Sequence, residues 1–279
     1  MSAGGRKAGG TGIIDRENAN AIPRFAEDVV RMQCRGVAGA GRSRRSPSAR
    51  PHAGFSEGIF NHLTLVVPGG TDRYYQIPFG MHWSEVTASC FMEVGIDDGL
   101  VKSGAGDVER SCFCIHAPIH KALPQAKAVF HTHMPYASAL TRLEDPRIKE
   151  IGQTEVGLSE AIAYDDAYAG PAIEPEEGVR LAGVIGDKSI LFMANHGIST
   201  VGATVADAYE RLYYVERAAQ VQIYAMWTGQ RLKQLPSPVV EKTKREYKDE
   251  HFYKGPTPAQ RHFDALKRML DRKEPDYAT

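Results

Sequence analysis

The chain has few cysteines and no excess of charge, and each shortage excludes a class of protein. Its 279 residues include only 4 Cys, too few for a scaffold built on disulfides. Cys112 and Cys114 are too close for an ordinary bridge and lack the spacing of a CxxC motif. Lys and Arg number 34, as do Asp and Glu, so no overall charge draws the chain to nucleic acid or to a membrane surface.

Long apolar segments are also missing. No run approaches the roughly 18 apolar residues of a transmembrane helix, and residues 1–12 lack the apolar core of a secretory signal. We therefore expect a reduced, cytoplasmic protein with no membrane and no nucleic-acid partner. The length fits one α/β domain with extensions, large enough to bury a sizeable core.

Hydrophobic periodicity predicts alternating strands and helices. The expected strands are Phe60–Val67, Tyr74–Ile77, Ala126–His131 and Ser189–Ala194; the expected helices are Val108–Leu123, Pro175–Ile185, Val205–Met226 and Thr257–Leu270, with a further helix opening at Trp83–Glu85. Strands mixed with covering helices predict a layered α/β or α+β domain.

Three histidines follow the ends of two of these strands. His131 and His133 close the first apolar run, and His196 follows the second within Asn195-His196-Gly197. Residues two apart in an extended segment point to the same side, so His131 and His133 can bind one ion. A third histidine from another strand end gives a three-ligand site with open positions, which a catalytic metal needs.

The order of the surrounding motifs is that of a known family. AVFHTHMPY at 128–136 is followed by IAYDD at 162–166, by FMANHGISTVG at 192–202 and by a long helix. This order resembles the class II aldolase/adducin family, which comprises metal-dependent aldolases, epimerases and decarboxylases, an iron oxygenase of aminocoumarin biosynthesis, and the adducin head domain. The resemblance implies a layered α/β fold with a central, mostly antiparallel sheet flanked by helices, and one divalent ion on His131, His133 and His196.

The resemblance also implies the domain organisation. We expect the catalytic domain over 54–228 and a C-terminal helical extension over 229–279. Residues 1–53 should form a poorly ordered tail, a short helix at Ile22–Cys34 and an Arg/Ser-rich segment at 35–50. That segment is a nucleic-acid patch, a solvated loop or a local sequence anomaly, and its lack of apolar periodicity favours the latter two.

The resemblance fails at the catalytic and phosphate-binding positions. Cys112 stands where the family's aldolases carry an acid/base Glu. Its side chain would be either a metal-ligating thiolate or a buried, inert thiol. Where those aldolases bind phosphate, this chain has His62, Phe79-Gly80 and Arg110-Ser111. Arg110, if not merely a surface charge, and His62 suit a carboxylate, and Phe79 suits a substrate with an apolar or aromatic part.

Three further residues are candidates for proton transfer. Tyr164 lies in the loop between the metal motifs, where its hydroxyl could protonate an intermediate or simply fill the core. Glu160 is the nearest remaining carboxylate to that loop in the sequence. His116 occupies a family position near the metal, and His120 is expected at a helix surface or core edge.

These features predict a metal-dependent lyase, most simply a decarboxylase of a 2-oxo or hydroxy acid. The ion would be Fe²⁺, Zn²⁺ or Mn²⁺ and would stabilise the enolate formed when a C–C bond breaks. One alternative is an Fe(II)- and O₂-dependent oxidative decarboxylase of an aromatic 2-oxo acid; the other is a non-catalytic scaffold like adducin. The resemblance implies a homo-oligomer, expected to be a tetramer.

Overall fold

The computed structural model describes residues 57–248 and 255–273. Within them, eight strands form a single sheet in the order β4-β3-β2-β1-β5-β8-β7-β6. The strands are β1 (His62–Val66), β2 (Arg73–Gln76), β3 (Met92–Gly95), β4 (Val101–Ser103), β5 (Ala128–Thr132), β6 (Ile162–Asp165), β7 (Ile190–Met193) and β8 (Ile198–Gly202). Neighbouring strands are antiparallel except β6 and β7, which run parallel.

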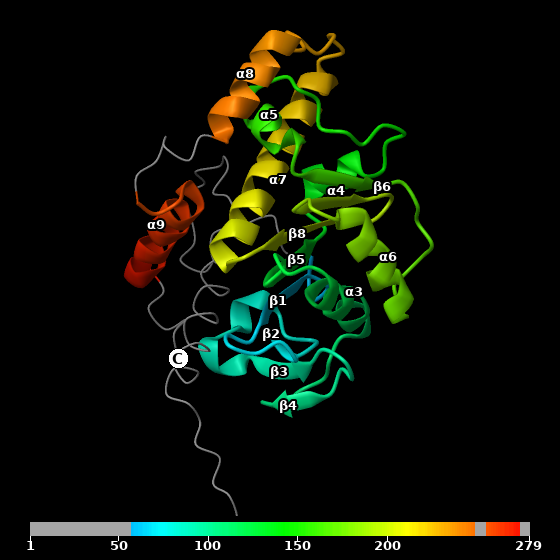
Figure 1. Cartoon of the computed structure of the whole chain (residues 1–279), viewed down its shortest axis with the longest axis vertical. Coiled ribbons are helices and arrows are strands. Elements are labelled where there is room, and N and C mark those ends of the chain that lie inside the picture. The colour runs from blue at the N-terminus through cyan, green and yellow to red at the C-terminus, as the bar shows by residue number, and fades with distance from the viewer. Residues whose placement is uncertain (1–56, 249–254, 274–279) are drawn as a thin grey trace, which may run out of the picture.

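Helices cover both faces of this sheet (Figure 1). They are α3 (Arg110–Ala122), α4 (Pro135–Leu140), α5 (Gln153–Ser159), α6 (Pro175–Ile185), α7 (Val205–Trp227), α8 (Ser237–Tyr247) and α9 (Pro258–Lys273), with 3₁₀ turns at Trp83–Glu85 and Ala88–Cys90. None of the helices in these ranges combines the length and apolarity needed to cross a bilayer. The sheet with its covering helices is the mostly antiparallel α/β architecture predicted from the sequence.

The central strands are buried on both faces, and alternate residues face different helices. Ala128 and Phe130 of β5 belong to the core beneath α7, whereas Val129 belongs to the core beneath α3 and α6. Because successive side chains of a strand point to opposite faces, His131 shares the side of Val129. His131 therefore lies on the α3 side of the sheet.

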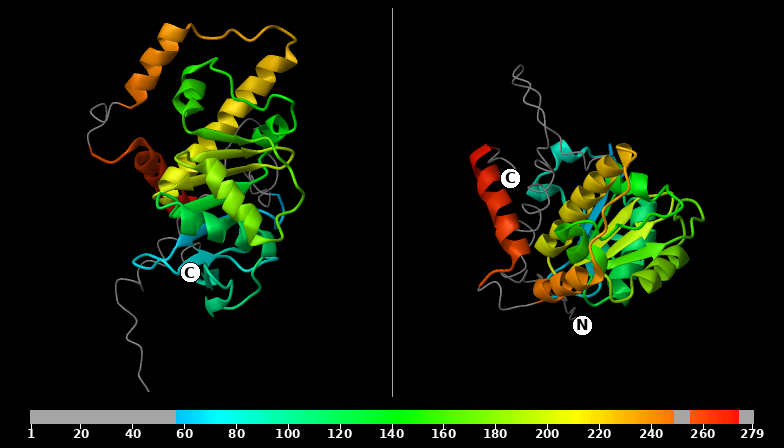
Figure 2. Two further views of the ribbon diagram at one scale, coloured as in Figure 1. Left: turned by 45° about the vertical axis from the view of Figure 1, so that its right-hand side comes forward. Right: turned by 90° about the horizontal axis from the view of Figure 1, so that it is seen from above.

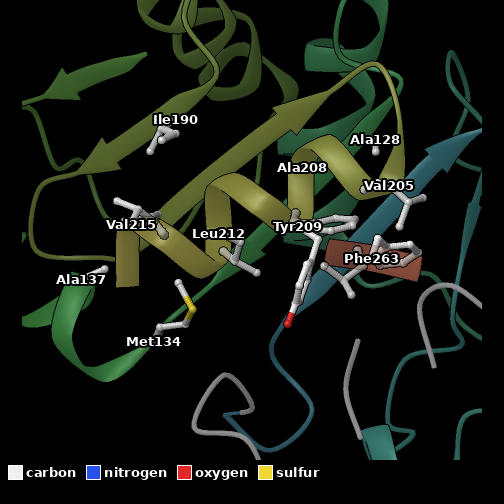
Figure 3. Packing of buried hydrophobic residues seen from close by; sticks show 14 of the residues in the cluster. Ala128, Met134, Ala137, Ile190, Val205, Ala208, Tyr209, Leu212, Val215 and Phe263 are labelled. Atoms are coloured by element: carbon white, nitrogen blue, oxygen red, sulfur yellow. The ribbon is translucent and has the colours of Figure 1, made fainter. Parts of the chain in front are cut away.

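The larger core lies on the α7 side of the sheet. Helix α7 forms there because an N-cap starts it and an apolar stripe lies along its length. Thr204 caps the helix by accepting the Asp207 backbone N–H at 3.1 Å. Tyr209 and Leu212 then project from α7 toward the sheet and α9 (Figure 3). Phe263 of α9 packs on Tyr209 with ring centroids 5.8 Å apart, so the C-terminal helix folds back onto the domain (Figure 2).

On the opposite face, α3 and α6 pack against each other at very close range. A Cβ placed on Gly178 of α6 would lie 2.1 Å from the carbonyl oxygen of Cys114 on α3. Only glycine permits this approach, and it fixes α3, with His116 and His120, over the sheet beside β1.

The structure departs from the predicted elements in a few places. The helix expected to open at Trp83 is wrong, because Trp83–Glu85 forms only a single 3₁₀ turn. Strands β3, β4, β6 and β8, and helices α4, α5 and α8, are additional to the predicted elements, and Tyr164, which was expected in a loop, lies on β6. The predictions for residues 1–53 lie outside the described residues, and the domain boundaries stay predictions.

Candidate active site and metal centre

His131, His133 and His196 converge at one end of the sheet. One ligand atom of each lies within 4.8 Å of the others, and the three ring centroids are 4.8 to 4.9 Å apart. His131 is on β5, His133 follows that strand, and His196 is in the turn between β7 and β8. The predicted metal ligands are thus brought together by two antiparallel neighbours, β5 and β8. We call these three residues the triad.

The Asn-His-Gly turn is shaped to deliver His196. Asn195 has φ of 54°, a left-handed conformation that asparagine tolerates better than most residues. A Cβ on Gly197 would lie 2.7 Å from both the His133 ring and the Thr132 carbonyl oxygen. Glycine therefore lets the turn lie directly against the end of β5.

Hydrogen bonds leave two ring nitrogens of the triad with free lone pairs. His131 Nδ1 lies 3.0 Å from the Ile198 carbonyl oxygen, which can only accept, so Nδ1 carries the proton. His133 Nδ1 contacts the Glu57 carboxylate in the same way. The two remaining Nε2 atoms face each other at 3.0 Å. Two facing lone pairs repel unless a cation lies between them, so these residues fit a divalent metal ion.

Burial keeps His131 and His196 of the triad in the neutral form that binds metal. Desolvation, followed by the neighbouring imidazoles, lowers the pKa of His131 well below its ordinary value. Burial, His133 and Arg142 lower the pKa of His196 to about 4. Both rings are therefore unprotonated near neutral pH, and ligation requires no proton release from them.

A second group of potential ligands lies beside the triad. His62, Cys112 and His116 are all buried and bring one ligand atom each within 4.8 Å of the others. His62 is paired with His131 across β1 and β5, with ring centroids 5.7 Å apart. We call these three residues the inner cluster.

The carboxylate nearest the inner cluster belongs to Glu109. Its Oε2 accepts the Cys112 backbone N–H at 2.6 Å and the Ser111 hydroxyl at 2.7 Å, and lies 3.2 Å from His62 Nε2. Burial alone would raise the pKa of Glu109, but these hydrogen bonds and His62 outweigh it and lower the pKa. Burial also raises the pKa of Cys112 well above its ordinary value, so without metal the thiol is neutral.

The comparisons with known proteins agree with this geometry. Residues 48–223 match the Class II Aldolase and Adducin N-terminal domain, well over half of the 279 residues. The chain belongs to the class II aldolase/adducin family. It is 32% identical over 235 residues to an adducin-related protein of Schizosaccharomyces pombe, which covers 81% of this chain and 71% of that protein. It is 31% identical to rat alpha-adducin, over 61% of this chain and 23% of that protein.

Solved structures of the family share the fold. An aldolase II superfamily protein from Pseudomonas syringae superposes with a TM-score of 0.79 at 27% identity, covering 93% of this chain and 96% of that one. An L-fuculose 1-phosphate aldolase from Glaciozyma antarctica gives a TM-score of 0.71 at 22% identity, covering 97% and 96%. At that identity, the second similarity describes architecture alone.

The predicted substrate-binding residues of this aldolase/adducin domain are distributed unevenly. His62 lies in the inner cluster, and Ser111 is bonded to Glu109. Arg110 instead donates to the Ile173 carbonyl oxygen at 2.8 Å and pairs with Glu174 at 3.3 Å, with 58% of its side chain exposed. Gripping a carboxylate would require it to leave these partners, and its binding role stays a prediction.

The apolar part of the predicted pocket is at the surface. Phe79 is exposed and packs on exposed Phe60, with ring centroids 6.1 Å apart. Gly80 has φ of +92°, and no atom lies within 4 Å of where its Cβ would be. These residues form an exposed aromatic pair next to an open turn, and Phe60 lies two positions before His62 in the chain.

Two of the three predicted proton-transfer residues are engaged elsewhere. The Tyr164 hydroxyl accepts the Ile148 backbone N–H at 3.0 Å, and burial raises its pKa. Glu160 pairs with Lys248 at 2.7 Å, which lowers its pKa, and this partner lies just after α8. Only His116 joins the potential ligands beside the triad. The catalytic roles of all three stay predictions.

Several residues near the triad escaped the sequence reasoning. Glu57 orients His133, and Glu109 caps α3 beside His62. Tyr168 lies with its ring 6.3 Å from that of His196 and lines a small pocket with it. The available signals were weak: Glu109 is three residues before Cys112, and Tyr168 lies just beyond the IAYDD motif.

Proposed function

We propose that this protein is a divalent-metal-dependent carbon–carbon lyase that decarboxylates a 2-oxo or hydroxy acid. The observation that carries the proposal is that the groups that could act as a base are already buried or hydrogen-bonded. Cys112 is 2% exposed, and the Glu109 carboxylate is held by two hydrogen bonds at the start of α3. Aldol cleavage begins with removal of a hydroxyl proton, whereas decarboxylation needs no such base.

The triad would hold the ion. A bound divalent ion supplies positive charge that stabilises the negative charge developing on substrate oxygens as the C–C bond breaks. The protein's part is to orient the ligands: Ile198 fixes the His131 ring and Glu57 fixes the His133 ring. Such outer partners keep the ligating nitrogens in place.

The surroundings support a carboxylate substrate with an apolar or aromatic part. His62 lies deep beside the triad, and Phe60, two residues before it, packs on Phe79 to present exposed ring surface. An exposed aromatic pair favours contact with an apolar substrate group. The homotetramer, which the resemblance implies, belongs to the same proposal.

Tyr168 is our candidate for returning a proton to the carbon that loses CO₂. It lines the pocket beside His196, and its side chain is 53% exposed, whereas Tyr164 already accepts the Ile148 N–H. Tyr168→Phe should lower turnover at unchanged metal content, and Tyr164→Phe is the matched control. If only Tyr164→Phe lowers turnover, the donor is Tyr164.

The all-nitrogen donor set favours a second candidate, an Fe(II)- and O₂-dependent oxidative decarboxylase. Imidazole ligands suit iron as well as zinc, and the three triad ligands leave coordination positions open. The aromatic pair suits an aromatic 2-oxo acid equally well.

One experiment separates these functions. Protein stripped of metal is reconstituted with Fe²⁺, Mn²⁺ or Zn²⁺ and given small 2-oxo acids, 4-hydroxyphenylpyruvate and fuculose phosphate, with and without O₂. Anaerobic CO₂ release that His133→Ala abolishes supports the lyase. Release only with iron and O₂ selects the oxygenase. Efficient sugar-phosphate cleavage without CO₂ overturns both, and tight metal binding to none of the three ions selects a scaffold role like that of the adducin relatives.

A further inference from the structure

The inner cluster contains buried nitrogen atoms without hydrogen-bond partners. His116 is 0% and His62 is 8% exposed. Among the described residues, neither ring nitrogen of His62 nor Nε2 of His116 makes a hydrogen bond, and His62 Nε2 has only the ion-pair contact with Glu109 Oε2 at 3.2 Å. Buried polar atoms are nearly always paired, so such a concentration of unpaired nitrogens requires an explanation, and an unseen ion is one of the few.

A chain of hydrogen bonds shows which His116 nitrogen has a free lone pair. His120 Nδ1 lies 2.6 Å from the Ala126 carbonyl oxygen and must donate to it. The neutral ring then accepts at Nε2, 2.8 Å from Thr64 Oγ1, so Thr64 gives its only proton there. Thr64 Oγ1 accepts from His116 Nδ1 at 2.8 Å. His116 Nε2 is therefore unprotonated and free to bind a metal ion.

Sulfur completes a donor set that zinc prefers. The Cys112 thiol lies with His62 and His116 in one group, and it donates a weak hydrogen bond to Gln76 Oε1 at 3.5 Å. Two imidazoles and a thiolate are ordinary ligands of tetrahedral zinc. The Gln76 amide can rotate to offer its NH₂ donor to the thiolate once the S–H proton has gone.

We propose that His62, Cys112 and His116 bind a second, thiophilic divalent ion such as Zn²⁺, distinct from the ion of the triad. Binding forms a metal–sulfur bond and releases the Cys112 thiol proton to solvent. The thiolate and the Glu109 carboxylate, 3.2 Å from His62 Nε2, together balance the two positive charges. The site therefore needs no ligand from the triad, and it does not rest on the proposed function.

The burial of the inner cluster indicates a structural ion. Its residues come from β1 and α3, which the ion would tie together behind the triad. Its three ligands leave a coordination position, but burial keeps that position from substrate, so an ion there would stabilise the fold by joining distant elements. We therefore expect it to fill during purification and to resist chelators longer than the triad.

Metal content and spectroscopy of the full chain test the proposal. Zinc-loaded wild type should hold two ions per chain, and Cys112→Ser should hold one. After Co²⁺ substitution, wild type should show a near-ultraviolet thiolate-to-cobalt absorption band, which Cys112→Ser loses and His133→Ala keeps. Cys114→Ser is the matched control, since Cys114 is an equally buried thiol on the same helix outside the inner cluster.

Zinc-edge X-ray absorption of the wild type needs no variant to fold. It should reveal sulfur at about 2.3 Å, the ordinary zinc–thiolate distance. One ion per chain, with a thiolate band that disappears in His133→Ala, would mean that Cys112 ligates the triad ion and would overturn the second site. Absence of any sulfur neighbour would overturn it as well.

Discussion

The triad and the inner cluster use similar donors on the same side of one sheet, yet they differ in their access to solvent. His133 of the triad has 20% of its side chain exposed, and its partner Glu57 has 61%. In the inner cluster, exposure is 8% for His62, 2% for Cys112 and 0% for His116. An open metal site can exchange water for substrate, whereas a sealed one cannot. Depth in the same fold would thus separate the proposed catalytic position from the proposed structural one.

The two groups also differ in what holds their rings. The triad is oriented by a backbone carbonyl and a surface carboxylate, from Ile198 and Glu57. The inner cluster is oriented by the Thr64–His120 relay, which ends on the Ala126 carbonyl. The Glu57 support of His133 is partly solvated. The Thr64–His120 support of His116 is buried.

Removing a triad ligand should give the largest effect. His131→Ala should lower metal affinity at the triad by more than the about 10- to 100-fold that loss of an outer partner costs, while zinc stays in the inner cluster. Elemental analysis after dialysis measures this, with His262→Ala as the control. Undiminished triad occupancy in His131→Ala would refute the ligand assignment.

In metal-free protein, acid should lower the free energy of unfolding, because the buried relay contains His120 in its neutral form. Burial lowers the pKa of His120 from 6.5 to about 4. Between these values the unfolded chain binds more protons than the folded one, so the free energy of unfolding falls as the pH drops from 6.5 to 4. At 1.36 kcal/mol per pKa unit, His120 alone accounts for about 3 kcal/mol.

Urea unfolding at pH 7.5 and pH 4.5, with chelator present, measures this loss. His120→Gln should be less stable at pH 7.5 but should lose less stability on acidification than wild type. An equal loss in both proteins would mean that His120 is not the group that titrates.

Loss of the outer support of the triad should have a smaller effect. Glu57→Ala leaves the His133 Nδ1–H without its carboxylate and should weaken triad metal binding by about 10- to 100-fold. Isothermal titration of metal-free protein should show only the weaker of two binding events shifted. A matching shift in both events would show that the two groups are not independent.

Removal of a helix cap should have the smallest effect. It also tests whether metal binding responds only to changes at the metal ligands. Thr204 caps α7 on the other side of the sheet, and Thr204→Ala should lower the free energy of unfolding by about 0.5–2 kcal/mol. Metal content and the cobalt band should stay as in wild type. A changed metal content would indicate that both sites respond to general stability rather than to their own ligands.

The sequence predicted the triad and the fold class because both depend on local signals. A strand end places His131 and His133 on one side, and the turn at Asn195 and Gly197 needs special backbone conformations that these residue types favour. The long helices were predicted for the same reason: α7 carries an apolar stripe and an N-cap in its own sequence.

Features that depend on distant partners were harder to predict. Strands β3, β4, β6 and β8, which were not predicted, have 4, 3, 4 and 5 residues, and they are ordered by pairing with their neighbours. His62 meets His116 only because β1 lies beside β5 and beneath α3. Likewise Tyr168, rather than the predicted Tyr164, faces His196, since the loop after β6 turns back toward the metal motif.

The long-range pairing of β1 with β5 also bears on when the sites form during folding. Strands β1 and β5 are separated in the chain by β2, β3, β4 and α3, so a long loop must close before they meet, which is slow. The inner cluster also needs β1 to reach α3, and the triad needs β5 to pair with β8, so both sets of ligands depend on contacts between distant segments. Metal should therefore leave the refolding rate unchanged and lengthen the lifetime of the folded state, because it stabilises contacts made after the transition state.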